Sequence, residues 1–340
     1  MRVKLTEICT PKQWKTIPAN ELLDKGYPVY GANGIIGYYN EYNHENPVVA
    51  ITCRGATCGT INITVPQSYV TGNAMCLDDT RSDILPEYLY YCLLHYDFNN
   101  VISGSAQPQI TRQGLEKVEI KYYPIEAQKK IVAILSKTRA VITAHHQQLQ
   151  ELDELVKARF VELFGDGNHP HIALIDLIIE GAGLSYGIVQ PGDDGTGDMG
   201  VLRPVDMVDG KISTASIKYI DRSIGDGFKK TELYGDELLI TVRGTTGITA
   251  LTDIRFNGMN VTRGIAVVRY DRNKINPVYL NAYLNTDESQ RYIQEHTRGA
   301  TLQQINLSDL RVQQIMVPPL ALQEQMAAFI EQIDKSKAAV

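Results

Sequence analysis

Residues 124–131 read Pro-Ile-Glu-Ala-Gln-Lys-Lys-Ile, and residues 319–326 read Pro-Leu-Ala-Leu-Gln-Glu-Gln-Met. Both segments begin with a proline, have a glutamine four positions later and continue with residues that favour helices. Proline suits the first turn of a helix, because the N–H that it lacks would have no partner there. Each segment therefore predicts the start of a helix, and their likeness predicts a duplicated chain.

Three further pairs of segments repeat in the same order along the chain. Residues 104–110 (Gly-Ser-Ala-Gln-Pro-Gln-Ile) return as Gly-Ala-Thr-Leu-Gln-Gln-Ile at 299–305, with the same spacing as the helix starts. At slightly shorter spacings, residues 51–57 return at 240–246 and residues 86–89 return at 277–280. A long-period repeat that keeps its order indicates a duplication with small loop differences.

The region before each predicted helix has the pattern of a mixed α+β domain. Short runs rich in β-branched residues, bounded by Gly and Pro, predict strands at 47–52, 60–65, 237–242 and 264–269. Residues 88–98 and 279–292 are expected to be helical. The predicted fold class is therefore α+β, with two repeated globular domains.

The predicted helices carry an apolar seam, which in the first helix is interrupted only at Arg159, where Phe160 lies beside it. In the first helix, apolar or small residues alternate at steps of four and three, which is typical of a coiled coil, and Gly165 suits its end. About 40 helical residues form a rod of roughly 60 Å. We expect the two helices to pair antiparallel, with the domains related by a pseudo-two-fold axis and His145 packed in the seam. The residues predicted to pair are Ile131, Leu135, Ile142, Leu149, Leu152 and Val156 in the first helix and Met326, Ile330 and Ile333 in the second.

These patterns divide the chain into four parts. We expect a first globular domain at 1–123, a central helix at 124–165, a second globular domain at 166–318 and a second helix at 319–340. The second helix is expected to be a shortened copy of the first, since Val340 corresponds to His145 in the repeat.

The composition excludes several classes of protein. The sequence has 340 residues, 44% of them hydrophobic, and lacks both an apolar run long enough for a membrane span and a secretory signal. It is expected to be cytoplasmic. The five cysteines show no C-x-x-C spacing, so we expect buried free thiols and no metal site. The acidic run at 193–198 lacks EF-hand spacing and is interpreted as a solvated loop.

Catalytic motifs are missing from the sequence. It has no Gly-rich AdoMet loop with an Asn/Asp-Pro-Pro-aromatic motif, no Gly-x-x-x-x-Gly-Lys-Ser/Thr phosphate loop and no convincing carboxylate cluster of a magnesium-dependent nuclease. The chain is therefore predicted not to be an enzyme. With a net charge of −6, any nucleic-acid surface must be a local patch. The charge slightly favours an alternative, a non-DNA scaffold with two binding modules on a coiled-coil stalk.

The duplicated pattern resembles the specificity subunits of Type I restriction-modification systems over essentially the whole chain. The resemblance is carried by residues 30–37 (Tyr-Gly-Ala-Asn-Gly-Ile-Ile-Gly), the Arg-Gly turns at Arg54 and Arg243, the segments 104–110 and 299–305, and the Pro-x-x-x-Gln helix starts at 124–128 and 319–323.

The resemblance implies a non-catalytic subunit whose two target-recognition domains each read half of a split double-stranded DNA target. The helices would set the distance between the halves and help to dock two methyltransferase subunits, with restriction subunits as further partners. AdoMet, ATP and Mg²⁺ are then expected on the partners, with no cofactor in this chain. The shortened second helix puts docking of one methyltransferase in doubt, and the unpaired part of the first suggests self-association.

A protein reads a base through hydrogen-bond donors and acceptors that its loops present to the DNA groove, and it contacts a phosphate mainly through cationic side chains. For Arg54 and Arg243, bracing of a turn is an equally good interpretation. The glutamines of segments 104–110 and 299–305 are interpreted first as part of the junction between domain and helix. The predicted DNA contacts are Arg54 and Thr57 in the first domain and Lys229, Lys230, Arg243, Thr245 and Thr246 in the second.

Overall fold

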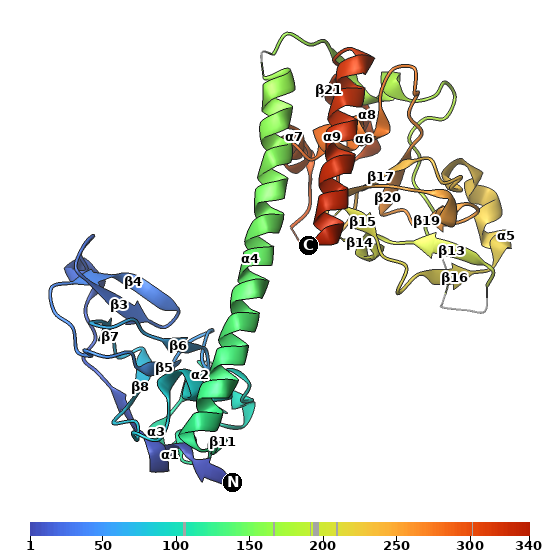
Figure 1. Ribbon diagram of the computed structural model, residues 1–340. Helices are drawn as coiled ribbons and strands as arrows, with labels where there is room; N and C mark the ends of the chain where they lie inside the picture. Colours follow the sequence, from blue (N-terminus) through green and yellow to red (C-terminus); the bar gives the residue numbers. More distant parts are fainter. Residues whose placement is uncertain (105–106, 166, 191, 193–196, 209, 301) are drawn as a thin grey trace. The chain divides into compact units, whose positions relative to one another are not determined.

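The computed structural model describes residues 1–104, 107–165, 167–190, 192, 197–208, 210–300 and 302–340 (Figure 1). Residues 105–106 and 301 of the repeated segments and 193–196 of the acidic run lie outside this description. The chain forms two compact units, Met1–Ala144 and His145–Val340. Each contains sheets and helices, so the expected α+β class with two similar domains is confirmed.

The first unit is built on an antiparallel sheet with the strand order β2-β8-β5-β6. Every residue of the central strand β5 is buried, and the helix α2 contacts β5 and β6. A second sheet has the order β4-β3-β7, and β1 pairs with β11. The strands and helices of this unit, in chain order, are β1 (Arg2–Lys4), α1 (Leu5–Ile8), β2 (Thr10–Gln13), β3 (Tyr27–Gly31), β4 (Gly34–Tyr39), β5 (Val49–Thr52), β6 (Ile61–Ile63), β7 (Tyr69–Val70), β8 (Ala74–Asp78), α2 (Pro86–Leu94), β9 (Ile102–Ser103), β10 (Gln109–Ile110), α3 (Arg112–Leu115) and β11 (Glu119–Lys121).

The second unit repeats the central hairpin as β17 and β18, with β20 on the other side of β17. A further sheet has the order β16-β13-β19, and β12 pairs with β21. The elements are β12 (His171–Ala173), β13 (Met199–Leu202), β14 (Met207–Val208), β15 (Lys211–Ile212), β16 (Lys218–Ile220), α5 (Arg222–Gly225), the 3-10 helix η5 (Asp226–Thr231), β17 (Leu238–Thr241), β18 (Thr249–Leu251), β19 (Asn260–Val261), β20 (Ile265–Val268), α6 (Pro277–Leu284), α7 (Asp287–His296), α8 (Leu307–Val312) and β21 (Gln314–Met316).

Two helix predictions need correction. The expected helix at 279–292 is two helices, because the chain breaks after Leu284 and Thr286 starts α7, its side chain accepting a hydrogen bond from Ser289 N at 3.3 Å. The expected helix at 88–98 ends at Leu94, and a short 3-10 turn follows at Phe98–Asn100.

A buried glutamine fixes the start of each long helix, α4 (Ile125–Phe164) and α9 (Leu320–Ala339). Gln128, which is fully buried, accepts a hydrogen bond from Leu85 N at 3.0 Å and donates to Asp83 O at 2.7 Å and Tyr123 O at 2.8 Å. Its side chain thus ties the first turn of α4 to the start of α2.

Gln323 does the same in the second unit. It is fully buried, accepts from Asn276 N at 2.8 Å and donates to Pro318 O at 2.7 Å. The partner positions match those of Gln128, since Leu85 and Asn276 both directly precede the proline that starts α2 or α6. The Pro-x-x-x-Gln pattern is therefore a repeated anchor between a domain and its helix.

The helix α9 runs antiparallel to the C-terminal part of α4 inside the second unit (Figure 1). Lys337 Nζ lies 2.6 Å from Asp153 Oδ1, and the Arg159 guanidinium lies 5.9 Å from the ring centroid of Phe329. Residue numbers rise along one helix as they fall along the other, which defines the antiparallel direction. The C-terminal end of α4 is buried here, with Phe164 packed edge-on against Tyr279 at 5.3 Å between ring centroids.

The residues predicted to pair the helices differ in burial. Met326 and Ile333 are buried, and Val156 and Ile330 pack against the core of the second unit. The side chains of 133–148 are all exposed, His145 included. The remaining predicted residues are half-buried (Ile131, Leu149 and Leu152) or exposed (Leu135 and Ile142).

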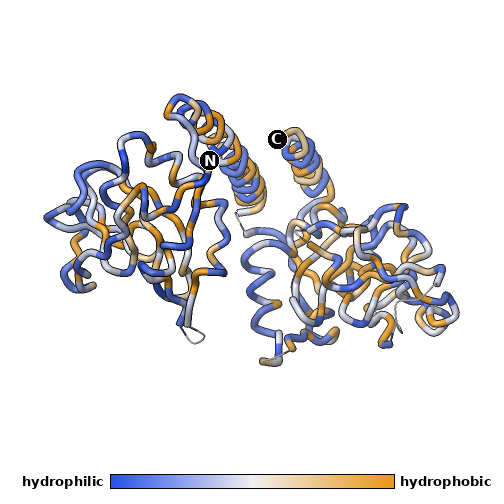
Figure 2. Tube along the Cα trace, turned by 90° about the horizontal axis from the view of Figure 1, so that it is seen from below, coloured by the Kyte–Doolittle hydropathy of each residue, from blue (hydrophilic) through white to orange (hydrophobic). Residues whose placement is uncertain are grey.

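Each unit has its own apolar core, visible in Figure 2 as hydrophobic segments gathered inside it. In the first unit this core joins β5 and β8 to α2, and in the second it joins β17 and β20 to α6 and the end of α4. Among the helices that the structure describes, none combines the length and apolarity needed to cross a membrane.

We expect Gln128→Met to destabilise the first unit by at least about 2 kcal/mol, because it leaves one N–H and two carbonyl groups without a partner in a buried place. Urea unfolding of the whole chain measures this change. Gln148→Met, at an exposed position of α4, is the matched control and should shift the unfolding free energy by less than about 0.5 kcal/mol. Equal effects of the two changes would contradict the anchoring role.

Candidate nucleic-acid interface

In each unit the Arg-Gly turn pairs with the repeated glutamine segment. In the first, Arg54 and Gln109 form an antiparallel bridge, with Gly55 N donating to Pro108 O at 3.1 Å and Ile110 N to Cys53 O at 3.0 Å. The two motifs lie far apart in the sequence, yet they form one structural feature.

The second unit repeats this arrangement. Arg243 bridges Gln304, Gly244 N donates to Gln303 O at 2.9 Å, and Ile305 N donates to Val242 O at 3.0 Å. We call each pair of segments the Arg-Gln module, defined as 53–55 with 108–110 in the first unit and 242–244 with 303–305 in the second.

The glycine in each module permits the turn. Gly55 has a φ of +88° and Gly244 a φ of +86°, in the left-handed region that favours glycine. No atom lies within 4 Å of where a Cβ would stand at either glycine. The backbone conformation, and not the space around it, therefore requires glycine after each arginine.

The two arginines are presented differently. Arg54 is exposed and Arg243 is half-buried. In the part of the chain that the structure describes, neither guanidinium has a hydrogen-bond or ion-pair partner. Bracing of the turn therefore has no contact to support it, and both groups are left available for an external acceptor.

A second arginine lies beside Arg243. Tyr186, Val189, Arg243, Arg263 and Gln304 line a hollow of about 180 Å³. Two guanidinium groups at one small hollow favour a ligand with negative or strongly accepting groups. Arg263 was not among the residues predicted from the sequence, although Arg263-Gly264 repeats the Arg-Gly dipeptide of Arg243-Gly244.

The first unit has a comparable hollow beside its own module. It measures about 380 Å³, and its lining includes Lys12, Gln109 and Arg112. The module glutamine therefore stands next to two cationic side chains in both units. Lys12 and Arg112 were not predicted from the sequence. Lys12 comes near Gln109 only in the fold, whereas Arg112 follows Gln109 by three residues in the chain.

The three threonines that were predicted to contact DNA differ in their exposure. Thr245 is exposed and lines a hollow of about 600 Å³ together with Gly244 and Gln303. Thr57 is half-buried. Thr246 is buried, with its hydroxyl 3.0 Å from that of Thr297. The Thr246 side chain therefore lies against Thr297, the residue that follows α7, and its contact with DNA stays a prediction.

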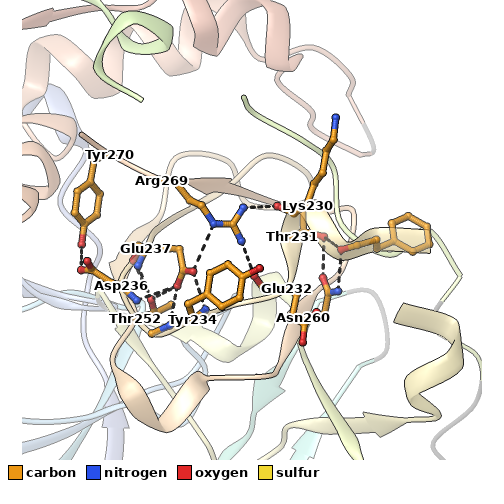
Figure 3. Close-up of polar contacts among 12 residues, drawn as sticks. Lys230, Thr231, Glu232, Tyr234, Asp236, Glu237, Thr252, Asn260, Arg269 and Tyr270 are labelled. Atoms are coloured by element: carbon orange, nitrogen blue, oxygen red, sulfur yellow. Dashed lines mark hydrogen bonds and ion pairs between the residues drawn. The ribbon is translucent and has the colours of Figure 1, made fainter. Parts of the chain in front are cut away.

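Lys229 and Lys230 are exposed at the end of η5, and Arg269 holds this loop in place (Figure 3). The Arg269 guanidinium donates to Lys230 O at 2.5 Å and also to Glu232 O. It lies 5.0 Å from the ring centroid of Tyr234. The backbone at Lys230 is thereby fixed to the residue that follows strand β20, and the side chains of Lys229 and Lys230 are left at the surface.

Glu237 is the buried counter-charge of Arg269. It is 1% exposed, and its carboxylate accepts hydrogen bonds from Tyr234 N at 2.7 Å, Gly235 N at 3.0 Å and Thr252 Oγ1 at 2.8 Å (Figure 3). Arg269 Nε lies 3.8 Å from it. A buried carboxylate is tolerated when donors and a cation compensate it, as they do here.

Asp236 lies in the turn just before β17, next to Glu237. Its carboxylate accepts hydrogen bonds from Tyr270 and Arg272, which follow β20, and so links this turn to the end of that strand. A hydrogen bond from the Arg272 guanidinium lowers the pKa of the Asp236 carboxyl, with a further contribution from Tyr270 and partial opposition from burial. The carboxylate therefore stays charged at neutral pH. Its contribution to stability is present above the ordinary aspartate pKa and is lost as the pH falls through the lowered value.

We expect Glu237→Gln to destabilise the second unit by about 3 kcal/mol, because its amide N–H groups would face backbone donors and Arg269 would lose its buried counter-charge. Urea unfolding is the measurement, with Glu295→Gln on the exposed face of α7 as the control. A loss no larger than that of the control would show that Glu237 does not anchor this loop.

Comparison with known proteins places these features in context. The family described as "Type I restriction modification DNA specificity domain" matches residues 1–154 and 198–339. The Type I restriction enzyme EcoBI specificity subunit of Escherichia coli is 25% identical over 150 residues, covering 44% of this chain and 31% of that protein. The EcoprrI specificity subunit of the same species is 30% identical over 141 residues, covering 40% of this chain and 35% of that protein. The matches span about a third of the length of these relatives.

A solved structure shows the same fold. The Type-I restriction-modification system S subunit from M. genitalium superposes with a TM-score of 0.68 at 13% sequence identity, covering 100% of this chain and 90% of that one. At this identity the likeness concerns the fold alone.

Proposed function

The chain belongs to the Type I restriction modification DNA specificity family, and on that premise we propose that it reads a split double-stranded DNA target without itself modifying the DNA. Each unit would read one half of the target. The observation that carries this proposal is the Arg-Gln module, which each unit contains with the same backbone pairing. Among the described residues, the guanidinium of its arginine has no hydrogen-bond or ion-pair partner.

The chemistry of the modules fits base reading. A guanidinium group donates two hydrogen bonds to the O6 and N7 acceptors of guanine in the major groove. Arg54 and Arg243, with Thr57 and Thr245 on the same turns, supply donors of this kind. Because the residues around the two modules differ, the two half-sites are expected to differ in sequence.

Phosphate contacts would come from local cations. Lys229 and Lys230 are exposed, and their loop is fixed by Arg269, so they are pre-arranged to contact a DNA backbone. A net charge of −6 is compatible with this, since only the charge facing the DNA matters.

We further propose that the chain docks two methyltransferase subunits, with restriction subunits as additional partners. These partners would supply AdoMet, ATP and Mg²⁺. The exposed apolar side chains Ile134, Leu135, Val141 and Ile142 of α4 support a protein-binding role for this part of the helix. Self-association is predicted through Leu149, Leu152 and Val156 of α4, of which Val156 packs against the core of the second unit. Light scattering tests this prediction.

The decisive experiment combines the chain with the methyltransferase subunit encoded beside it and AdoMet, then maps methylated bases in a random DNA pool. We expect a motif with two short specific halves and a fixed gap. Methylation that ignores this chain, together with no complex between the proteins, would favour a non-DNA scaffold with two binding modules.

Arg54→Ala and Arg243→Ala should each relax sequence preference in one half of the motif and leave the other half intact. If each arginine reads a guanine, removing it costs about 1–3 kcal/mol of binding free energy. Titration against duplexes altered in one half at a time measures this. An unchanged affinity and motif in a folded variant would remove that arginine from the interface.

Lys229→Ala and Lys230→Ala should weaken binding to every DNA sequence by a similar factor. Each would lower the slope of log affinity against log salt concentration by about one, because one phosphate contact is lost. Lys335→Ala on the exposed face of α9 is the control. A change in sequence preference without a change in salt slope would contradict a phosphate role.

A further inference from the structure

We propose that His44, Cys76 and Asp78 in the first unit form a binding site for a divalent transition-metal ion of the zinc class. A ring nitrogen of His44, the sulfur of Cys76 and a carboxylate oxygen of Asp78 all lie within 4.8 Å of one another. Cys76 and Asp78 are two positions apart on β8, so their side chains leave the same face of the strand. His44 comes from the loop between β4 and β5.

The sequence predicted no metal site because its cysteines and histidines are not closely spaced. His44 lies 32 residues before Cys76, and antiparallel pairing of β5 with β8 brings the two segments together. This proposal does not depend on DNA recognition.

The surroundings of His44 fix which ring nitrogen carries hydrogen. The Asn43 amide is held in one orientation, because Val70 N donates to its Oδ1 at 2.9 Å and its Nδ2 donates to Val70 O at 3.0 Å. That Oδ1 lies 2.6 Å from His44 Nδ1. An amide oxygen only accepts hydrogen bonds, so Nδ1 is the donor and a neutral His44 has its lone pair on Nε2.

The lone pair of Nε2 faces a carboxylate. His44 Nε2 lies 3.0 Å from Asp78 Oδ1, while the other oxygen, Oδ2, accepts a hydrogen bond from Trp14 Nε1 at 3.0 Å. Two acceptors in contact repel each other unless a positive charge lies between them. A proton, carried by the ring or by the carboxyl group, or a metal ion therefore occupies the space between Nε2 and Oδ1.

The arrangement around this space is that of a prepared metal site. Ligating histidines commonly donate their other ring N–H to a carbonyl or carboxylate, and ligating carboxylates are themselves hydrogen-bonded. Asn43 and Trp14 provide these two supports for His44 and Asp78.

Cys76 distinguishes a metal ion from a shared proton. Its side chain is fully buried, and its sulfur lies within 4.8 Å of the ligand atoms of His44 and Asp78. A proton shared by His44 and Asp78 does not involve this sulfur, whereas a zinc-class ion can bind it. A zinc-class ion would displace the thiol proton and bind the thiolate, a soft ligand that Mg²⁺ and Ca²⁺ do not favour.

The distances suit such an ion. Tetrahedral zinc with sulfur, nitrogen and oxygen ligands places the ligand atoms roughly 3.3–3.8 Å apart. The three atoms here reach that spacing by shifts of about 1 Å or less. A fourth position is open to water, since His44 and Asp78 also line a hollow of about 550 Å³.

The experiment titrates the metal-free full-length chain with Co²⁺ and then with Zn²⁺. We expect a thiolate-to-cobalt charge-transfer band together with the visible bands of tetrahedral cobalt, and we expect Zn²⁺ to remove both. Zn²⁺ should also raise the Tm of the first unit, because it binds the folded state preferentially. A weakly buffered solution should acidify, because the metal ion displaces the thiol proton of Cys76 when the sulfur binds as a thiolate.

Cys76→Ser should abolish the charge-transfer band and the Zn²⁺-dependent rise in Tm, and Asp78→Asn should weaken Zn²⁺ binding at least tenfold. Cys92→Ser is the matched control, because Cys92 is a half-buried thiol on α2, outside the cluster, and its loss should leave the band in place. The proposal is overturned if the unaltered chain shows no thiolate-to-cobalt band, or if that band survives in Cys76→Ser.

Discussion

A buried glutamine one turn into each long helix is the constraint on which the rest of the structure depends. Gln128 and Gln323 each accept from the backbone N–H that precedes the proline of a short helix and donate to the carbonyl that precedes their own proline. Each long helix therefore leaves its globular domain from a fixed point. The same contacts in both repeats give the two helix starts the same local geometry.

The Arg-Gln modules depend on a second constraint, which is backbone pairing across a long stretch of sequence. The turn after β5 or β17 is closed by a segment that arrives only after the following helices, so the arginine is held in place by the folded domain and not by its neighbours in the chain. Backbone pairing therefore holds Arg54 and Arg243 in place, although their guanidinium groups have no partner among the described residues. The cations beside each module come from different parts of the fold. Arg263 lies in the turn between β19 and β20, Lys12 lies on β2, and Arg112 starts α3.

The candidate interface depends on where individual charges lie, and not on the net charge of the chain. An acidic protein presents Lys229 and Lys230 at its surface and buries Glu237 among backbone and hydroxyl donors. The buried carboxylate and Arg269 shape the loop, and the exposed lysines give it its charge (Figure 3). Net charge therefore said little about the candidate interface, since buried and exposed charges have different roles.

The sequence by itself determined the duplication, the α+β class, the long helices and the turns that carry Arg54 and Arg243, because these depend on local spacing and on periodicities that read directly along the chain. It also determined that the Pro-x-x-x-Gln starts matter, without giving the reason.

Only the tertiary structure decided that each Arg-Gly turn pairs with a glutamine segment, that Thr246 faces inward, that Arg263 joins Arg243, and that His44 meets Cys76 and Asp78. Side-chain neighbours from distant strands are set by sheet register and packing, and a single sequence without its fold does not specify which residues those are.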